Sequence, residues 1–327
     1  MLLCSGSIHI NVPLENAGED AVLCLTDRED AILAAVFDGC GGSGGRQYPK
    51  AGGWTGAKLA SRVGVESLSH WFALSGGKSR SLAASCAEIG EWTRKGLQRA
   101  YELVKDGSAS RIVSSMSLSL PTTLAAVTAR VPEDNCYRLR YYWAGDSRGY
   151  LFLPGGLVQI TRDNSDAAYG DGESMEDFMD TNPNNVLSAA RDYTVYGREL
   201  SVREPCMVLV ASDGCTSCLR SPLELEQLLL ETLASSVSLQ GWEEELKAAF
   251  TPRSSDDYSL VLCVLGFQSF EAVKTAYAPR LEEFRTRYAP GLSAAWQTGD
   301  TAPLYGLWEE YKPSYLGKNL TIREATS

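Results

Sequence analysis

Four apolar runs in this chain are each bounded by an aspartate in a turn sequence. Runs of this length predict buried strands, and the glycine, serine and aspartate beside them predict sharp turns. Mg²⁺ and Mn²⁺ prefer carboxylate and carbonyl oxygens, and glycine lets a backbone carbonyl approach an ion. Four aspartates at strand ends therefore predict one oxygen-rich metal centre between sheets. They are Asp38 after residues 31–37, Asp146 after 141–144, Asp213 after 207–211, and Asp256 before 258–265.

Each of these aspartates has a simpler explanation when it is considered alone. Aspartate commonly forms turns and caps directly after a strand. Taken together, the four positions favour a metal centre over four unrelated turns. The metal hypothesis therefore depends on the set and on no single residue.

Length, composition and charge limit the class of protein. With 327 residues, the chain can form one large domain or two, and a hydrophobic content of 44% is ample for a buried core. A net charge of −11 argues against nucleic acid or an anionic membrane as the main partner, since both require a basic surface. We therefore expect neither of these partners.

The cysteines indicate a reducing compartment. Nine cysteines are an odd number, and they are scattered through apparent strands and helices, which is typical of reduced, buried thiols. The first residues lack a cationic start and a long apolar stretch, so we expect no signal peptide. No run approaches the roughly 18 apolar residues of a membrane span. These features predict a soluble, cytoplasmic protein.

The order of apolar patterns predicts an α+β fold, with two antiparallel sheets covered by helices. Strands alternate with pairs of helices, and the strands between 122 and 160 form a meander. The expected strands are 8–12, 21–26, 31–37, 122–131, 137–143, 149–153, 157–160, 192–197, 206–211 and 258–266. The expected helices are 54–72, 82–103, 223–233, 242–250 and 280–289, and residues 163–185 are expected to form an inserted loop.

Six short motifs stand in an order that resembles the metal-dependent protein phosphatases of the PPM (type 2C) family, in a divergent bacterial branch. The resemblance covers roughly residues 5–267, which we expect to form the phosphatase domain. Any single motif is weak, but the ordered set is specific. The motifs are Glu19-Asp20, Asp38-Gly39, Thr122-Thr123, Gly145-Asp146-Ser147-Arg148, Ser212-Asp213-Gly214 and Ser255-Asp256-Asp257.

The resemblance implies a β-sandwich of two antiparallel sheets flanked by helices, with two Mn²⁺ or Mg²⁺ ions at one end and a weaker third ion in many members. Carried over by motif, Asp38 would bridge two ions and the carbonyl of Gly39 would bind one. Asp213 and Asp256 would complete the direct ligands, and Asp146 would hold the third ion. The first acidic motif contributes Asp20 to the metal site, where with Glu19 it would orient metal-bound water.

The chain departs from the family at two catalytic positions. Glu15 and Asn16 stand near the place of an arginine that binds substrate phosphate, and Cys40 stands where a histidine acts as general acid. Asn164 also replaces a usual histidine. Two aids to catalysis are therefore missing from their usual places.

Three other residues could replace the missing groups. The opening segment is similar to a bacterial branch in which a strand histidine precedes the acidic pair, so His9 could stand near the phosphate; a histidine packed at the sheet edge is the alternative. Arg46 or Lys50 could bind the phosphate, or both could be solvated loop cations. These alternatives stay open at the level of sequence.

Residues 268–327 lie beyond the resemblance and form a C-terminal extension. Residues 270–288 have helical spacing, and within this segment Pro279 and Pro290 bound 280–289 as one expected helix. The segment 296–315 contains five tryptophans and tyrosines, whereas free tails are poor in aromatics. We therefore expect this helical, aromatic-rich extension to dock on the core.

The resemblance implies an enzyme, a protein serine/threonine phosphatase (a phosphoric monoester hydrolase) that acts in signalling. It would hydrolyse phosphoserine and phosphothreonine by attack of a metal-bridging water, because two ions can activate water and neutralise the phosphoryl oxygens together. The expected partners are a phosphoprotein substrate and a companion Ser/Thr kinase. Two alternatives remain: a pseudophosphatase-like regulatory or binding module that keeps its metals, and a phosphatase of a small phosphate ester.

Overall fold

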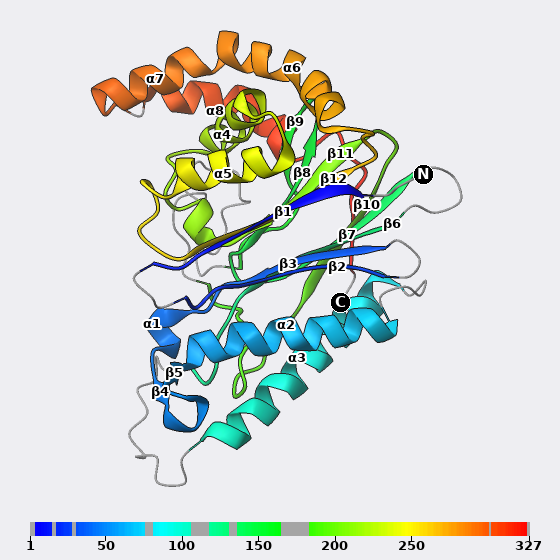
Figure 1. The fold of residues 1–327 in the computed structure, drawn as a ribbon, viewed down its shortest axis with the longest axis vertical. Coiled ribbons are helices and arrows are strands. Elements are labelled where there is room, and N and C mark those ends of the chain that lie inside the picture. Colours follow the sequence, from blue (N-terminus) through cyan, green and yellow to red (C-terminus); the bar gives the residue numbers. More distant parts are fainter. Residues whose placement is uncertain are drawn as a thin grey trace.

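Two antiparallel sheets lie face to face, and helices cover the outer face of each sheet (Figure 1). The structure is a computed structural model, and it describes residues 4–14, 18–27, 31–75, 81–105, 118–130, 136–164, 183–300 and 302–325. The expected α+β class, with a helix-flanked sandwich, is confirmed. Glu15, Asn16 and most of the loop expected at 163–185 lie outside the described residues.

The first sheet has five strands in the order β1-β12-β11-β8-β9. All neighbouring strands in it run antiparallel. Its edge strand β1 was predicted from residue 8 and begins four residues earlier. The strands are β1 (Cys4–Val12), β8 (Arg148–Leu153), β9 (Gly156–Gln159), β11 (Cys206–Ala211) and β12 (Tyr258–Leu265).

The second sheet has six strands in the order β13-β10-β7-β6-β3-β2. One edge strand of this sheet, β13, comes after helix α8 (Ala302–Tyr315) in the sequence and was not predicted. The strands are β2 (Ala21–Thr26), β3 (Ile32–Phe37), β6 (Leu124–Arg130), β7 (Tyr137–Ala144), β10 (Tyr196–Val202) and β13 (Arg323–Glu324).

Helices form the two outer layers. Figure 1 shows α2 and α3 on the side of the six-stranded sheet, and α4 to α8 on the side of the five-stranded sheet. Short elements follow β3 and β11. The helices are α2 (Gly56–Ser75), α3 (Leu82–Val104), α4 (Pro222–Ser235), α5 (Leu239–Phe250), α6 (Phe270–Arg287), α7 (Ala289–Thr298) and α8 (Ala302–Tyr315). The short elements are α1 (Gly41–Gly44), β4 (Gln47–Tyr48), η1 (Pro49–Ala51), β5 (Trp54–Thr55) and η3 (Asp213–Cys215).

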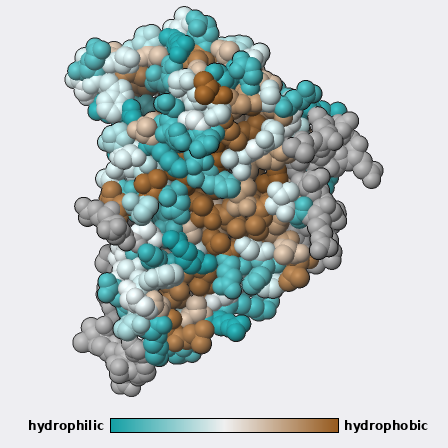
Figure 2. Space-filling view, viewed as in Figure 1, coloured by the Kyte–Doolittle hydropathy of each residue, from teal (hydrophilic) through white to brown (hydrophobic). Residues whose placement is uncertain are grey.

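The continuous apolar runs of β3, β11 and β12 follow from burial on both faces. One face of each strand packs between the sheets, where aliphatic side chains of both sheets form one cluster. The other face packs against the helices, α2 and α3 on one side and α4 to α8 on the other. A strand buried on both faces reads as an uninterrupted apolar run. Figure 2 shows hydrophobic side chains across the middle of one face, where the sheets lie in Figure 1.

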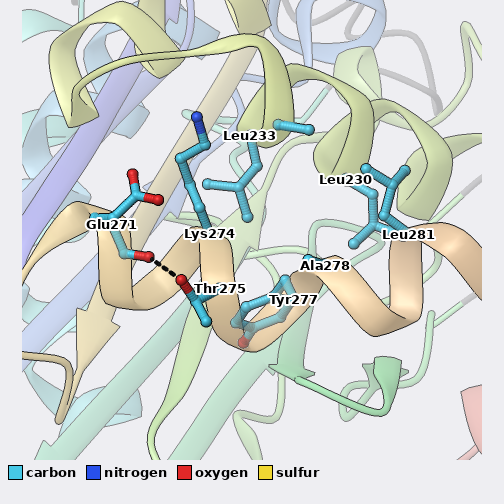
Figure 3. Close-up of a pocket in the computed structure, with 9 residues that line it drawn as sticks. Leu230, Leu233, Glu271, Lys274, Thr275, Tyr277, Ala278 and Leu281 are labelled. Atoms are coloured by element: carbon cyan, nitrogen blue, oxygen red, sulfur yellow. Dashed lines mark hydrogen bonds between the residues drawn. The ribbon is translucent and has the colours of Figure 1, made fainter.

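The helices α6 to α8 pack against α4 and against the outer face of the five-stranded sheet. Tyr277 of α6 donates a hydrogen bond to the carbonyl of Phe152 in β8. Between α4 and α6 lies a groove of about 310 Å³, and Figure 3 shows leucines of α4 that point toward α6 across it. Trp308, Tyr311 and Tyr315 of α8 are buried. These three aromatic side chains of the extension therefore serve to pack it against the rest of the protein.

The boundaries expected for one strand were wrong. Residues 192–197 were predicted as a strand, but β10 runs over Tyr196–Val202. The side chain of Asn185 binds both backbone groups of Thr194: its amide donates to the carbonyl and its oxygen accepts from the N–H, at 2.8 Å each. These bonds occupy the groups that a strand ladder would use.

A helix predicted to begin after Pro279 instead runs through it. Helix α6 spans Phe270–Arg287. Pro279 lies on the exposed face of the helix, and the opposite face buries Val273, Tyr277, Arg280, Leu281 and Phe284. Because burial of each large apolar side chain contributes about 2 kcal/mol, this face offsets the roughly 3 kcal/mol cost of an internal proline.

No helix in the described ranges is both long enough and apolar enough to span a lipid bilayer.

The packing of α6 on α4 predicts a large difference between two arginines of the same helix. Arg280 binds the fully buried Glu226, with Nε 2.6 Å from Oε1. We expect Arg280→Met to lower the free energy of unfolding by about 3–5 kcal/mol, because it leaves a buried carboxylate without its cation. Urea denaturation measures the loss.

The matched control is Arg285→Met, because Arg285 pairs with Glu231 while half of its side chain is exposed. An exposed pair of this kind contributes about 0–1 kcal/mol. Equal losses in the two variants would contradict the assignment of the Arg280–Glu226 pair as an anchor of the extension.

Candidate metal centre

The strand register brings the acidic motifs to one end of the sandwich. Asp20 directly precedes β2 and Asp38 directly follows β3, and these strands pair Ala21 with Phe37, so the two aspartates stand side by side. In the other sheet, β11 ends before Asp213 and β12 begins after Asp256, with Ala211 opposite Leu260. The turn between β7 and β8 adds Asp146. This is the end of the sandwich from which the chain leaves β3 toward α1 (Figure 1).

Two threonines hold the backbone at Asp38. The N–H of Asp38 donates to Oγ1 of Thr123 at 3.2 Å, and its carbonyl accepts from the hydroxyl of Thr122 at 2.7 Å. The N–H of Thr123 donates to the same carbonyl at 2.8 Å. The Thr122-Thr123 motif therefore fixes the end of β3 through backbone atoms, and the carboxyl group of Asp38 takes no part in these bonds.

Asp20 carries a buried oxygen without a partner. The residue is 1% exposed, and its Oδ2 accepts no hydrogen bond in the described structure. The pKa of Asp20 is raised to about 7: burial is the largest cause, the hydroxyls of Ser259 and Ser212 oppose the rise, and the charges of Asp213 and Asp257 add to it. A buried carboxylate oxygen without a donor is costly unless a proton or a cation neutralises it. Asp20 therefore fits a cation site.

The other aspartates show the same mutual repulsion. Burial raises the pKa of Asp38 well above its usual value, and the charges of Asp213 and Asp20, together with a hydrogen bond to Asp213, add to the rise. Burial, followed by the charges of Asp213 and Asp163, raises the pKa of Asp146 to about 8. Carboxyl groups this close share protons when no cation lies between them.

The pKa of Asp256 is also raised, by burial and by the charge of Asp213. The residue nevertheless lies on an exposed part of the loop before β12. Among the residues that the structure describes, no three His, Cys, Asp or Glu side chains stand together in an arrangement that could hold a metal ion. The carboxylates are thus gathered at one end of the sandwich without forming a closed ligand set.

Two glycines allow the loops to approach one another. A Cβ on Gly39 would lie 2.8 Å from the carbonyl oxygens of Glu19 and Ala57, and a Cβ on Gly214 would lie 2.0 Å from that of Asp257. Real Cβ atoms do not come this close to backbone oxygens. The glycines of the Asp38-Gly39 and Asp213-Gly214 motifs are therefore required by packing at the site.

Asp257 organises the acidic motif, a role that the sequence did not reveal. Its Oδ1 accepts from the N–H of Leu14 and its Oδ2 from the N–H of Glu19, at 2.5 Å each. The residue is 6% exposed. Asp257 therefore ties the loop before β2 to the start of β12, beside Asp256. The adjacent pair Asp256-Asp257 was the available signal, but the sequence does not show which of the two would bind a metal and which would position the loop.

One face of α2, together with Thr55 at the end of β5, binds the first acidic motif, which sequence reasoning also missed. The hydroxyl of Thr55 donates to the carboxylate of Glu19, and the hydroxyl of Ser61 donates to its carbonyl. Arg62 donates to the carbonyls of Asp20 and Gly18. Residues three to four apart share one face of a helix, so the spacing of 58, 61 and 62 was a readable signal.

Lys58 of the same helix face supplies a positive charge near the acidic motif. Its charge lowers the pKa of Glu19, although burial raises that pKa by a larger amount. Its Nζ lies 5.6 Å from the centre of the Trp54 ring. Lys58 is therefore a cation that the fold brings to this end of the sandwich.

The structure places the three other candidate residues in different surroundings. His9 is exposed on β1, and its pKa is raised by a hydrogen bond with Cys24 and by the charges of Cys24, Glu243 and Cys4. Cys24 pairs with Ala34, four residues from Asp38, which corresponds to about 13 Å along a strand. His9 thus lies beside Cys24 and not beside the aspartates.

The loop cations make other contacts. The guanidinium of Arg46 lies over the ring of Tyr48, 5.2 Å from its centre. The Nζ of Lys50 donates to the carbonyl of Lys105 at 2.9 Å, at the end of α3. Neither contact involves an aspartate of the candidate site.

Arg148 and Asn164 stabilise the turn that carries Asp146. Arg148 binds Asp163 with two nitrogens, and both side chains are at least nine-tenths buried. The side-chain oxygen of Asn164 accepts from the N–H of Gly145 at 3.1 Å. These bonds hold the β7–β8 turn, in which Gly145 adopts a φ of +94°.

Solved structures of bacterial serine/threonine phosphatases share this architecture. The phosphatase PstP of Mycobacterium tuberculosis matches with a TM-score of 0.56 at 20% identity, over 80% of this chain and 98% of that chain. The catalytic domain of a serine/threonine protein phosphatase PstP, in complex with two manganese ions, matches with a TM-score of 0.53 at 21% identity, over 80% and 97%. The PPM Ser-Thr phosphatase MsPP of Mycobacterium smegmatis, in complex with cacodylate, matches with a TM-score of 0.53 at 19% identity, over 81% and 100%.

Comparison of the sequence with protein-family models finds no match, and comparison with curated proteins finds none either. The likeness is therefore one of structure, and at these identities it establishes the fold. The order of the motifs predicted the same architecture. The chain has the fold of the PPM-type serine/threonine phosphatases.

Proposed function

We propose that this protein is a metal-dependent phosphatase that hydrolyses phosphoserine and phosphothreonine in proteins. One observation carries the proposal: the strand register gathers aspartates from both sheets at one end of the sandwich, where Asp20 keeps a buried oxygen without a partner. The fold shared with bacterial serine/threonine phosphatases supports the same reaction class. A phosphoprotein is accordingly the proposed substrate, and a Ser/Thr kinase would produce it.

The donor atoms at this end are of the kind that suits Mn²⁺ or Mg²⁺. Their donors are carboxylate and backbone oxygens, which hard divalent ions prefer. Asp20, Asp38, Asp213, Asp256 and the carbonyl of Gly39 are proposed to hold two ions, and Asp146 is proposed to hold a third. When bound, the ions supply a nucleophile from water at neutral pH and neutralise charge on the phosphoryl oxygens. A solved structure with this fold contains two manganese ions, which supports the choice of metal.

The chain's own residues would position the reacting groups. Thr122 and Thr123 hold the backbone of Asp38, and Asp257 holds the backbone of Glu19. Lys58, near Glu19, is a candidate for binding the substrate phosphate, because an ammonium attracts phosphate as a point charge. Arg46 and Lys50 remain proposed phosphate-binding residues, and His9 remains a proposed catalytic residue. Each of these three would require its side chain to leave the contact described above.

Cys40 limits how the leaving group is protonated. Burial and the charges of Asp146 and Asp213 raise the pKa of the Cys40 thiol far above neutrality. A group with such a pKa is a poor general acid at pH 7, since the best catalytic pKa lies near the working pH. An aryl oxygen leaves without protonation more readily than a serine oxygen. The proposed enzyme therefore depends on a proton donor for its protein substrates more than for aryl phosphates.

The metal-dependent mechanism predicts that Asp38→Asn and Asp213→Asn abolish hydrolysis of an aryl phosphate. Each substitution removes a carboxylate proposed to bind the ions, and we expect kcat/KM to fall by about a thousandfold or more. Turnover is measured with Mn²⁺, with Mg²⁺ and with EDTA. Asp192→Asn is the control, because Asp192 is fully exposed and pairs with Arg94 on the surface.

A panel of phosphoserine and phosphothreonine peptides, compared with small phosphate esters, identifies the substrate class. Faster turnover of peptides supports the proposal, and a strong preference for one small ester contradicts it. Tight metal binding without any turnover would assign a binding module instead.

Restoring a general acid should favour substrates with poor leaving groups. We expect Cys40→His to raise kcat for a phosphoserine peptide by about tenfold to a hundredfold, because general acid catalysis contributes factors of this size. The rate with p-nitrophenyl phosphate should change little. Steady-state kinetics with both substrates test this, and Cys40→Ser serves as the control for a change of size alone. An equal gain with both substrates would contradict a role in leaving-group protonation.

The stability of the metal-free protein should decrease as pH rises. The pKa values of Asp20 and Asp146 are raised to about 7 and about 8, above the 3.8 of a free aspartate. The folded state therefore binds more protons than the unfolded state, so this stabilisation is complete below about pH 4 and is lost as pH rises through about 7 to 8. In EDTA, the unfolding temperature should fall between about pH 5.5 and about pH 8.5.

Asp146→Asn should make this pH dependence weaker, because it removes one of the titrating groups. Mn²⁺ should stabilise the protein most at the upper end of the range, where protons no longer compete for the carboxylates. Differential scanning calorimetry measures both effects. A metal-free protein that becomes more stable with rising pH would contradict this account.

A further inference from the structure

Three cysteines and one histidine lie along the edge of the sandwich where β1 and β2 face each other. β1 and β2 are edge strands of the two sheets, and they contact each other. Cys4 and His9 belong to β1, Cys24 belongs to β2, and Cys263 belongs to β12, the neighbour of β1. The Sγ atoms of Cys24 and Cys263 are 3.8 Å apart. The two sheets are therefore linked at this edge by a thiol–thiol contact.

Cys24 and Cys263 differ in access and in charge. Cys24 is partly exposed, whereas Cys263 is fully buried. A hydrogen bond from Cys263 lowers the pKa of Cys24, and a hydrogen bond and the charge of His9 lower it further, although burial opposes this effect. The pKa of Cys263 is raised by its bonds to Cys24 and Cys4. The pair therefore consists of a partly exposed thiol whose pKa is lowered and a fully buried thiol whose pKa is raised.

Cys4 shares part of this environment, because it is partly exposed and a hydrogen bond with Cys263 lowers its pKa, but the hydrogen bond with His9 belongs to Cys24. Cysteines outside the cluster have different surroundings. Burial raises the pKa of the Cys86, Cys206 and Cys215 thiols. The thiol of Cys215 donates to the carbonyl of Ser259, and that of Cys218 donates to the carbonyl of Cys215. Reactive cysteines are partly exposed and lie near a positive group, while buried thiols are inert. Among the described cysteines that these observations cover, Cys24 meets these conditions.

We propose that Cys24 is a site of oxidation by hydroperoxides and that Cys263 is the thiol that resolves the oxidised product into a disulfide. The inference stands on the 3.8 Å contact, the exposure of Cys24 and the adjacent imidazole of His9. It does not depend on the proposed phosphatase activity.

The reaction has two steps. The Cys24 thiolate attacks one oxygen of the hydroperoxide, the O–O bond breaks, and the other oxygen leaves as an alcohol or water after taking a proton that the His9 imidazolium can supply. Cys24 is now a sulfenic acid. The Cys263 thiol then attacks this sulfur, and water leaves as the S–S bond forms. The two thiols have lost two electrons, and the hydroperoxide has gained them.

The cross-link requires the sulfur atoms to approach from 3.8 Å to about 2 Å. Rotation of the two side chains can provide part of this movement. The edge position of β2 can provide the rest, because an edge strand is paired on only one side. The site is thus suited to a reversible bond between the sheets.

Peptide mapping of the full-length protein tests the proposal. The reduced protein is treated with a slight excess of hydrogen peroxide, blocked with N-ethylmaleimide and digested with trypsin and a Glu-specific protease. The second enzyme cuts at Glu15 and Glu19 and so separates Cys4 from Cys24. We expect a peptide containing Cys24 joined to one containing Cys263, and dithiothreitol should release them. A Cys4–Cys263 link, or oxidation of other cysteines while Cys24 stays reduced, would overturn the proposal.

Variants separate the two steps. Cys263→Ser should leave Cys24 as a sulfenic acid that dimedone traps, and Cys24→Ser should prevent both the trapped product and the cross-link. Cys206→Ser is the matched control for Cys263→Ser, because Cys206 is equally buried and lies on the adjacent strand β11. It should not change the cross-link. Unchanged cross-linking in Cys24→Ser contradicts the assignment, and circular dichroism checks that each variant is folded.

Discussion

Repulsion among carboxylates at one end of the sandwich is the constraint that the neighbouring structure has to satisfy. Burial and nearby negative charge raise the pKa of Asp20, Asp38 and Asp146, so the metal-free site is held together against its own electrostatics. The restraints are bonds to backbone atoms from Thr122, Thr123 and Asp257. These bonds do not occupy the carboxyl groups of Asp20 and Asp38, which stay available for the proposed ions. The paired strands fix the positions of the turns, and the turns carry the negatively charged aspartates.

Much of the fold could be predicted because strands that are buried on both faces have long, uninterrupted apolar sequences. The runs of β3, β11 and β12 are unambiguous for this reason. Predictions failed where a distant side chain decides the local structure. Asn185 binds the backbone of Thr194, so β10 begins only after that residue. Helix α6 continues past Pro279 because its opposite face is buried. The two-residue strand β13 is too short to leave a pattern.

The candidate site was partly predictable for a similar reason. Asp38 and Asp213 stand next to buried strands and glycines, and so they can be found by pattern. The contacts of Asp257 and Arg62 depend on how separate loops meet, which no local pattern encodes. His9 stays a prediction that the sequence alone could not decide. Its motif context indicated catalysis, while in the structure it interacts with Cys24, which pairs with Ala34, four residues from Asp38.

The pairing of β13 with β10 has a consequence for how the protein is made. Helices α6 to α8 cover the five-stranded sheet, yet the segment after them crosses to the other sheet, where Glu324 binds Arg198 at 2.6 Å and Arg198 donates to the carbonyl of Ile160. The edge of the six-stranded sheet is therefore completed by residues that leave the ribosome after all of its other strands. Until then β10 is an open edge, able to pair with another chain. A nascent chain has to protect this edge during synthesis, and the folded chain closes it with β13.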